Sequence, residues 1–203
     1  SNDPVVAARS RKRLKKHIKN ETLSVAGWRT VPTNPSVCGE MALESMPCIE
    51  QVFVNIPHGW NPHDAERRLF VARRLAAYEN MNLEEPDDLF YVATFSNLTT
   101  VYKGLVMPEN LAEFYPDLKD PRLESAICLF HQRFSTNTLP NWKYAQPFRY
   151  LAHNGEINTL KGNVNWMRSH EIRMASNAFG DRAEDIKPII PSGASDSSAL
   201  DSV

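Results

Sequence analysis

The residues best suited to chemistry are concentrated between positions 131 and 162. At the start of this stretch, Arg133 lies where an apolar run gives way to a loop rich in hydroxyl groups, which includes Thr136. A guanidinium in such a place binds a carboxylate through two parallel hydrogen bonds, and a neighbouring hydroxyl adds a third. A structural salt bridge is the alternative, and for a single arginine it is the commoner role. The pattern makes Arg133 and Thr136 candidates for carboxylate binding.

A second group is the pair Asn154-Gly155, which follows an apolar run at 148–153. Asn154 offers a side-chain N–H2, and Gly155 offers a backbone N–H that no side chain obstructs. Two donors that converge on one point form an oxyanion hole, although Asn-Gly is also the commonest hairpin turn. Further on, Asp196 lies among small residues and could hold an ammonium group, while most such acids belong to polar loops.

Short β-rich runs alternate with helical stretches around these residues. Two strands are predicted at 22–30 and 49–55 from their β-branched and aromatic content. An amphipathic helix is predicted at 64–78, with Leu69, Val71, Ala72 and Leu75 facing inward and Arg67, Arg68, Arg73 and Arg74 mostly outside. The remaining predicted elements are a basic helix at 3–20, a hairpin of 89–96 and 99–107 around Asn97-Leu98, a short helix from 107 to about 116, strands at 126–133 and 148–153, a helix at 158–174 capped by Asn158, and a loop at 175–203.

The mixed order of these elements favours an α+β fold of layered antiparallel sheets covered by helices over a regular βαβ array. The 203 residues suit one domain with a substantial core. No apolar run approaches the roughly 18 residues of a membrane helix, and the first residues contain no apolar run of the signal-peptide kind, so a cytoplasmic protein without membrane contact is expected. Three scattered cysteines, without a CxxC motif, argue against a disulfide framework or a metal site.

The basic helix at 3–20 raises the question of nucleic acid, because it holds seven basic residues against one acid. A nucleic-acid-binding arm is one interpretation, and a solvated helix face is the other. No aromatic or Gly-rich RNA-binding signature follows, and the net charge of the chain is −1. We therefore expect no nucleic-acid partner, and a salt-titrated binding assay would test the alternative.

Beyond these single features, one long string of residues is specific. It comprises FHQRFSTNT at 130–138, PNW at 140–142 and AQPFRYLAHNGEINT at 145–159, with GWRTVPT at 27–33, QVFV at 51–54 and SDSSALD at 195–201 in agreement. This string resembles the glutaminase domain of bacterial glutamate synthase large subunits, which are class-II glutamine amidotransferases. The resemblance covers nearly the whole chain from about position 22.

The resemblance implies an N-terminal-nucleophile (Ntn) hydrolase fold, an αββα sandwich of two antiparallel sheets that is truncated here. It also implies roles for single residues. Arg133, assisted by Thr136, would bind the α-carboxylate of L-glutamine, and Asp196 would bind its α-ammonium. Asn154 and Gly155 would form the oxyanion hole.

The nucleophile of such domains is an N-terminal cysteine whose own α-amine is the base, a pairing that works because a free α-amine titrates near ~8. This sequence begins with Ser1-Asn2, which we interpret as a cloning remnant, and 3–203 as an internal part of the domain. Cys38 is not expected to replace the nucleophile, because its nitrogen is held in a peptide bond. Cys38, Cys48 and Cys128 are interpreted as small buried hydrophobes. We therefore expect no nucleophile and no hydrolysis by these residues alone.

No cofactor or metal is expected in this segment, since it contains neither GxGxxG nor a cysteine cluster. For the whole enzyme, the resemblance implies FMN and an iron–sulfur cluster in the remaining domains of the large subunit, with FAD and NADPH on a small reductase subunit. Ammonia would pass to the flavin site and aminate 2-oxoglutarate. Two alternatives stay open: an amidotransferase domain that feeds another acceptor, and a non-catalytic glutamine-binding module.

Overall fold

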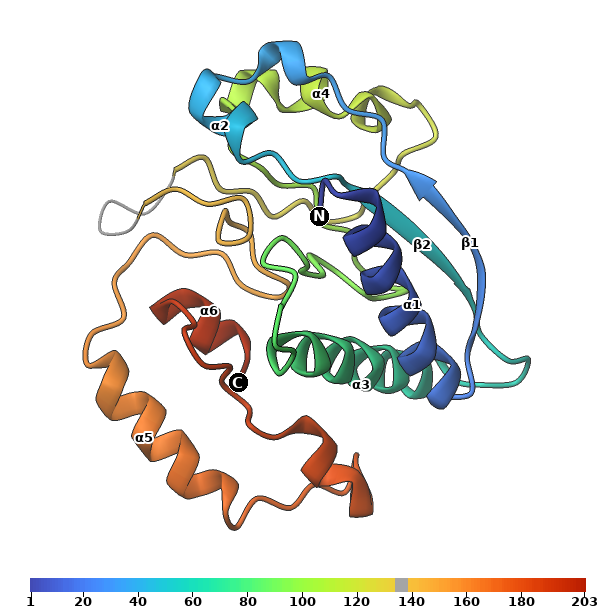
Figure 1. Ribbon diagram of the computed structural model, residues 1–203, viewed down its shortest axis with the longest axis vertical. Helices are drawn as coiled ribbons and strands as arrows, with labels where there is room; N and C mark the ends of the chain where they lie inside the picture. The colour runs from blue at the N-terminus through green and yellow to red at the C-terminus, as the bar shows by residue number, and fades with distance from the viewer. Residues whose placement is uncertain (134–138) are drawn as a thin grey trace.

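The computed structural model describes residues 1–133 and 139–203 of the chain. Six α-helices, four short 3-10 segments and two strands are present among these residues (Figure 1). In chain order the elements are α1 (Pro4–Asn20), β1 (Ser24–Thr30), η1 (Pro35–Val37), α2 (Glu40–Glu44), β2 (Glu50–Asn55), α3 (Pro62–Met81), η2 (Pro108–Asn110), α4 (Leu111–Phe114), η3 (Pro116–Lys119), α5 (Leu160–Glu171), η4 (Gly180–Ile186) and α6 (Asp196–Asp201).

The two long helices, α1 and α3, begin in the same way. Asp3 caps α1 by accepting hydrogen bonds from the backbone N–H groups of its first turn, and Asn61 does the same for α3. A proline follows each cap, where its fixed φ fits the first turn and its missing N–H is not needed. The helices predicted at 3–20 and 64–78 are therefore confirmed.

The only sheet among the described residues is the antiparallel pair β1–β2, in which Trp28 is opposite Val52. A bulge between Val25 and Gly27 shifts the register and increases the twist of the ribbon. The predicted strands at 22–30 and 49–55 are confirmed. The facing sheets of a sandwich are not seen in the part of the chain that is described.

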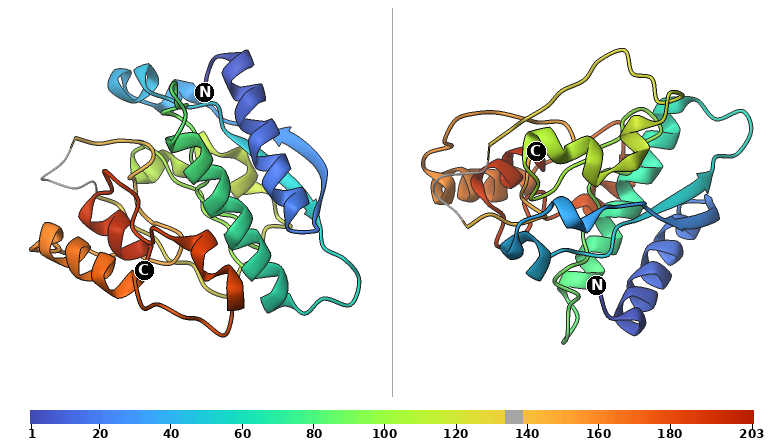
Figure 2. Two further views of the ribbon diagram at one scale, coloured as in Figure 1. Left: turned by 60° about the horizontal axis from the view of Figure 1, so that its bottom comes forward. Right: turned by 90° about the horizontal axis from the view of Figure 1, so that it is seen from above.

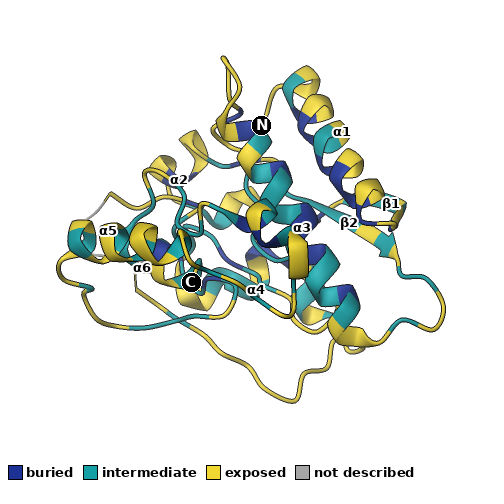
Figure 3. Ribbon diagram, turned by 90° about the horizontal axis from the view of Figure 1, so that it is seen from below, coloured by how far each residue is buried: buried dark blue, intermediate teal, exposed yellow. Residues whose placement is uncertain are grey.

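Two apolar clusters form the core. The first lies where α1 and α3 pack on each other and on the β1–β2 ribbon, and its buried residues are Leu14, Ile18, Leu23, Leu69, Ala72 and Ala76. The second lies beneath α2 and α4, and its buried residues are Val31, Ala42, Phe114, Tyr115 and Trp142. Figure 3 shows the buried stripes of α1 and α3 facing each other, whereas α5 carries no buried residue. Apart from Trp142, the two clusters therefore belong to the first 120 residues, and the later buried residues Ala145, Phe148, Ala183, Ile186 and Ala199 lie outside them.

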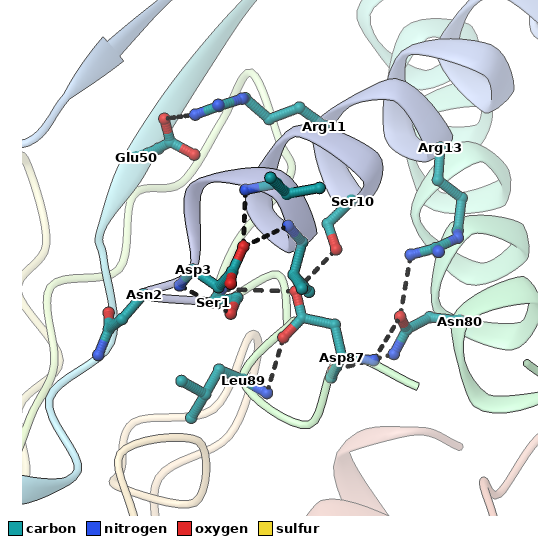
Figure 4. A network of polar contacts seen from close by, with 12 residues as sticks. Ser1, Asn2, Asp3, Ser10, Arg11, Arg13, Glu50, Asn80, Asp87 and Leu89 are labelled. Carbon is teal, nitrogen blue, oxygen red and sulfur yellow. Dashed lines mark hydrogen bonds and ion pairs between the residues drawn. The ribbon is translucent and has the colours of Figure 1, made fainter. Parts of the chain in front are cut away.

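A polar network joins α1 to α3 beside the first cluster (Figure 4). The buried Asp87 carboxylate accepts a 2.7 Å hydrogen bond from Ser10 of α1. Asn80 of α3 accepts from the Asp87 backbone N–H and donates to its carbonyl, and Arg13 donates to Asn80 at 2.9 Å. Arg11 pairs with Glu50 of β2 at 2.5 Å. Part of the basic face of α1 is thus used for packing within the chain.

The predicted hairpin at 89–96 and 99–107 is wrong, because neither run belongs to a β-ladder. The chain does turn at this point. The Ser96 hydroxyl accepts from the backbone N–H groups of Leu98 and Thr99, as in an ST-turn. The Asn97 backbone N–H donates to Glu66 of α3 at 2.6 Å. Side chains therefore satisfy the backbone N–H groups of this turn.

The strands predicted at 126–133 and 148–153 are also wrong. The first run exposes its apolar side chains, with Ile127 at 85% and Phe130 at 71%, because no neighbouring strand covers them. The second run turns back on itself, since the Phe148 N–H donates to the Leu151 carbonyl at 2.8 Å. Apolar content alone does not make a strand when no partner is present.

The short helix expected after 107 is confirmed by η2 and α4, and the helix expected at 158–174 by α5. The cap was wrong: Thr159, not Asn158, precedes the helix, and it lies in the left-handed region with φ +61°. The expected loop at 175–203 contains η4 and α6. Short polar helices of this kind lack the long apolar period by which a helix is predicted.

The arginines of α3 are not mostly outside, because all four are half-buried. Arg74 donates to the carbonyls of Ile186, at 2.8 Å, and Pro188. Arg68 donates to Glu21, which is fully buried and also forms a two-pronged pair with Arg182 of η4 at 2.6 and 2.8 Å. These contacts attach the last quarter of the chain to α3. Figures 1 and 2 show α5 and α6 on the side of α3 away from β1 and β2.

Candidate glutamine site

Two histidines make parallel contacts near the predicted site residues. The ring of His131 accepts at Nδ1 from the Arg133 backbone N–H at 3.2 Å, and its Nε2 lies 2.9 Å from the His153 carbonyl oxygen. Because Nδ1 is an acceptor, the neutral ring carries its proton on Nε2 and donates it to that carbonyl. The segment that holds Arg133 is thereby attached to the segment that holds Asn154 and Gly155.

The ring of His153 is used in the same way. Its Nδ1 accepts from the Gly155 backbone N–H at 3.2 Å, and its Nε2 lies 2.7 Å from the Ser197 hydroxyl. The same tautomer follows, so His153 donates to Ser197 and cannot take its proton. A nucleophilic serine needs a base that accepts from it. This His–Ser pair is therefore a structural link and not a nucleophile with its base.

The backbone of His153 is fixed by a single side chain. Gln146 accepts from its N–H at 2.8 Å and donates to its carbonyl at 3.0 Å. This pair of hydrogen bonds resembles one step of a β-ladder, made by an amide side chain in place of a second strand. It holds the turn that follows without a sheet.

Asp196 is the first residue of α6, which Ser195 caps. Its carboxylate accepts from the Ile157 backbone N–H at 3.2 Å, from the Ser197 N–H at 2.7 Å and from the Ser197 hydroxyl at 3.3 Å. Partial burial raises the pKa of Asp196, but these hydrogen bonds from Ile157 and Ser197 outweigh it, so the pKa lies below its ordinary value. The carboxylate is held ionised and half-exposed beside the 153–157 turn.

The other end of α6 is attached to the same loop. The buried carboxylate of Asp201 pairs with Arg149 at 3.1 Å and accepts from the Tyr150 backbone N–H at 3.1 Å. Arg149 also donates to the Val92 carbonyl at 2.8 Å. The two ends of α6 thus hold it against the 146–157 loop, which fixes the place of Asp196 relative to Asn154 and Gly155.

The structure places the predicted residues as follows. Arg133, Asn154 and Gly155 are exposed, Asp196 is half-exposed, and Thr136 lies outside the described residues. Hydrogen bonds of His131, His153 and Ser197 join the three segments that carry the other four. The Gly155 N–H, predicted as an oxyanion donor, is already engaged with His153.

A cavity of about 260 Å³ lies elsewhere, between α1, β2 and the extended run 89–103. Its lining includes Trp28, Tyr91 and Lys103 but none of Arg133, Asn154, Gly155 and Asp196. Lys103 lies under aromatic rings and donates to the Lys143 carbonyl at 2.8 Å, and burial lowers its pKa to about 8. The predicted site is therefore an exposed, hydrogen-bonded cluster distinct from this cavity.

The cysteines show no activated thiol. Cys38 is half-buried, and burial raises the pKa of its thiol, which is the reverse of what a nucleophile needs. Cys48 and Cys128 are exposed, so the interpretation of these two as buried hydrophobes was wrong. Within the described ranges there is no group of three or more His, Cys, Asp or Glu side chains that could hold a metal ion.

The network of 131–133, 146–157 and 195–201 coincides with the string of residues that the sequence singled out, and comparison with known proteins decides the family. The model of the class-II glutamine amidotransferases matches residues 1–203. The chain belongs to this family. No helix among the described residues is long and apolar enough to cross a membrane.

Its similarity to single proteins is high over a short part of each. It is 48% identical over 179 residues to the NADPH glutamate synthase large chain of Azospirillum brasilense, which covers 88% of this chain and 12% of that protein. It is 46% identical over 196 residues to the corresponding Bacillus subtilis chain, covering 94% and 13%. The ferredoxin-dependent glutamate synthase of Spinacia oleracea is 42% identical over 200 residues, covering 98% and 12%. The chain thus spans about an eighth of the length of these relatives.

Sequence reasoning missed His131, Gln146, His153 and Ser197. A signal for two of them was present, because His131 and His153 each stand two residues before a predicted site residue. This is the spacing at which a side-chain acceptor reaches a backbone N–H.

Proposed function

We propose that these residues form the glutamine-binding part of a glutaminase domain of the glutamate synthase type, with an Ntn-hydrolase sandwich as the fold of the complete domain. The observation that supports this most is the hydrogen-bonded network that joins the Arg133, Asn154–Gly155 and Asp196 segments. The α-carbon of glutamine carries a negative carboxylate and a positive ammonium group. The network joins the segment of the cationic Arg133 to that of the anionic Asp196. The relatives named above are all glutamate synthases, which favours a glutaminase domain of this type over an amidotransferase domain that feeds another ammonia acceptor.

Each role follows from the chemistry of the group. Arg133 is exposed and always charged, so it can grip the α-carboxylate with two parallel hydrogen bonds, with Thr136 as a further donor. Asp196 stays ionised and can accept from the α-ammonium. The side-chain amide of Asn154 and the backbone N–H of Gly155 can donate to the oxygen of the side-chain amide as negative charge develops there.

These 203 residues on their own are proposed to bind glutamine without hydrolysing it. None of their cysteines belongs to the described network. Partial burial raises the pKa of the Cys38 thiol, so its reactive thiolate form is disfavoured. A glutamate-release assay should therefore give the rate of buffer alone. Turnover that Cys38→Ala abolishes would show that this cysteine is the nucleophile after all.

For the whole protein we propose that the ammonia passes to a flavin site in other domains of the large subunit, where 2-oxoglutarate is aminated. FMN and an iron–sulfur cluster would be bound in those domains. A small reductase subunit with FAD and NADPH is the proposed partner, in keeping with the NADPH enzymes among the relatives. Other relatives are named for ferredoxin or NADH.

Isothermal titration of the chain with L-glutamine tests the proposal. Saturable binding is expected, and Arg133→Gln or Asp196→Asn should each weaken it about tenfold or more, since each removes a charge-assisted hydrogen bond. Arg122→Gln is the matched control, because Arg122 is exposed and pairs only locally with Asp120. Absence of saturable binding, or equal losses in the control, would rule the proposal out.

A further inference from the structure

His131 and His153 have no role in the proposed function, yet they hold equivalent positions in it. Each accepts at Nδ1 from the backbone N–H two residues later, which belongs to Arg133 in one case and to Gly155 in the other. Each donates from Nε2 to a different segment. His153 stands at the centre, because its backbone and ring together make five of these hydrogen bonds.

We propose that His153 is a positioning residue of the glutamine site, which holds the Asn154–Gly155 turn and the Asp196 carboxylate in a fixed relation through Ser197. This inference rests on the proposed function, because it assigns a purpose to the fixed relation. It concerns the arrangement of the binding groups and not the reacting atoms, which His153 does not touch.

The Asp196 arm of the link runs through one hydroxyl. Since His153 donates to the Ser197 oxygen at 2.7 Å, the hydroxyl proton is directed away from the ring, and Asp196 is the acceptor at 3.3 Å. The Ser197 N–H donates to the same carboxylate oxygen. The carboxylate is therefore held on one side, and its remaining lone pairs can receive an ammonium group.

The Gly155 arm explains how an engaged amide can still serve. The exposed Gly155 N–H donates to the neutral imidazole nitrogen of His153 at the long distance of 3.2 Å, so this hydrogen bond is weak. An oxygen that gains negative charge is a stronger acceptor than this nitrogen. The amide is thus held in one orientation at rest and can transfer to the substrate as charge develops.

Two substitutions separate the arms. His153→Asn places a carbonyl where Nδ1 was, so it can accept from Gly155 as in an Asx-turn, but it is too short to reach Ser197. His153→Gln places an N–H2 where Nε2 was and keeps the Ser197 link, but it loses the acceptor for Gly155. Ser197→Ala leaves the Gly155 arm intact and removes the hydroxyl, and with it both the hydrogen bond from His153 and the one to Asp196. Ser198→Ala is the matched control, because Ser198 takes part in local hydrogen bonds through its backbone.

Three measurements are made on each variant of the full chain: the glutamine dissociation constant by calorimetry, the exchange rate of the Gly155 amide by NMR, and the titration of the Asp196 carboxyl carbon. His153→Asn and Ser197→Ala should weaken glutamine binding about tenfold, as expected for a hydrogen bond to a charged group, and move the Asp196 titration to higher pH. His153→Gln should exchange the Gly155 amide about tenfold faster and should weaken glutamine binding less than His153→Asn does, because it keeps the Ser197 link.

The outcomes distinguish this inference from the proposed function. If the wild-type chain does not bind glutamine, the proposed function fails, while the amide exchange and the Asp196 titration still decide whether His153 positions both groups. If glutamine binds but Ser197→Ala and His153→Asn behave like Ser198→Ala, the positioning role is overturned and the function stands. Unchanged Gly155 exchange in His153→Gln overturns the Gly155 arm.

Discussion

The two parts of the molecule, residues 1–120 and 121–203, are held together by different forces. The first part has both long helices, the sheet and nearly all of the two apolar clusters. The second part has short helices, of which α5 has no buried residue, and a network of hydrogen bonds between side chains and backbone. Apolar burial is strong and non-directional, whereas hydrogen bonds add little net stability but fix orientation. The residues proposed to bind glutamine lie in the second part, among contacts of the second kind, on a base built from the first.

The sharpest test of this comparison removes one aromatic ring from each part. Phe114 is fully buried between Tyr115 and Trp142, and Phe130 is 71% exposed. Phe114→Ala should lower the free energy of unfolding by about 3–5 kcal/mol through lost transfer energy and a cavity. Phe130→Ala should change it by less than about 0.5 kcal/mol. Urea unfolding followed by circular dichroism measures both, and similar losses would contradict the comparison.

The contact between the two parts gives the next largest effect. Glu21→Gln keeps the shape of the buried Glu21 side chain but removes the charge that Arg68 and Arg182 share. Both arginines are about two-fifths exposed and can be hydrated when the charge of Glu21 is removed. We therefore expect the free energy of unfolding to fall by about 2 kcal/mol, which is less than the cost of leaving a buried charge without a partner.

Limited proteolysis should also cut near η4 sooner in this variant than in wild type. Glu124→Gln is the control, because Glu124 is exposed. A loss of stability without faster cleavage near η4 would show that Glu21 does not attach the second part.

A smaller effect is expected where Trp142 enters the second cluster. A Cβ at Gly104 would lie 2.5 Å from the rigid, buried Trp142 ring, so the ring or the backbone must move. Gly104→Ala should destabilise by about 1–2 kcal/mol, as expected for overpacking. Gly39→Ala meets no atom within 4 Å and is the control. The tryptophan fluorescence of the chain should shift in the first variant only, and an unchanged stability would show that the Trp142 ring does not lie against Gly104.

The smallest expected effect is a pH dependence from Asp196. Its pKa is depressed in the folded chain, so protons bind the unfolded chain more readily. The stabilisation is complete above the ordinary value of 3.8 and is lost as the pH falls through the lower folded value. Because the carboxylate is partly exposed, the effect is small. Comparing acid unfolding of wild type and Asp196→Asn should show a steeper loss in wild type, and parallel curves would contradict the assigned hydrogen bonds.

Sequence reasoning predicted the elements correctly where the pattern of apolar residues reflects which side chains are buried. The helices α1 and α3 were predicted from their apolar stripes, and the strands β1 and β2 from their β-branched and aromatic content. It failed at 126–133 and 148–153, where apolar runs looked like strands but have no partner, and a strand is stable only when it is paired. Local composition contains no information about whether a partner is present.

For the site, sequence reasoning named the residues that are proposed to contact glutamine and missed those that hold these residues in place. Arg133, Asn154, Gly155 and Asp196 carry recognisable chemistry, and the structure joins their segments. Gln146 was passed over because a glutamine that binds the backbone of His153 has no motif of its own. Such links arise from tertiary proximity, which spacing along the chain does not encode.

The Glu21–Arg182 bridge also bears on the order of events during synthesis. Its two residues are 161 positions apart, so Glu21 leaves the ribosome long before its partner exists. The first part can meanwhile collapse around its own apolar clusters, with Arg68 as the early partner of Glu21. Contacts of such sequence separation form late, because a long loop must close first. We therefore expect residues 1–120 to fold before the proposed binding site. Chains that end before Arg182 should be compact but should lack the bridge that attaches the second part.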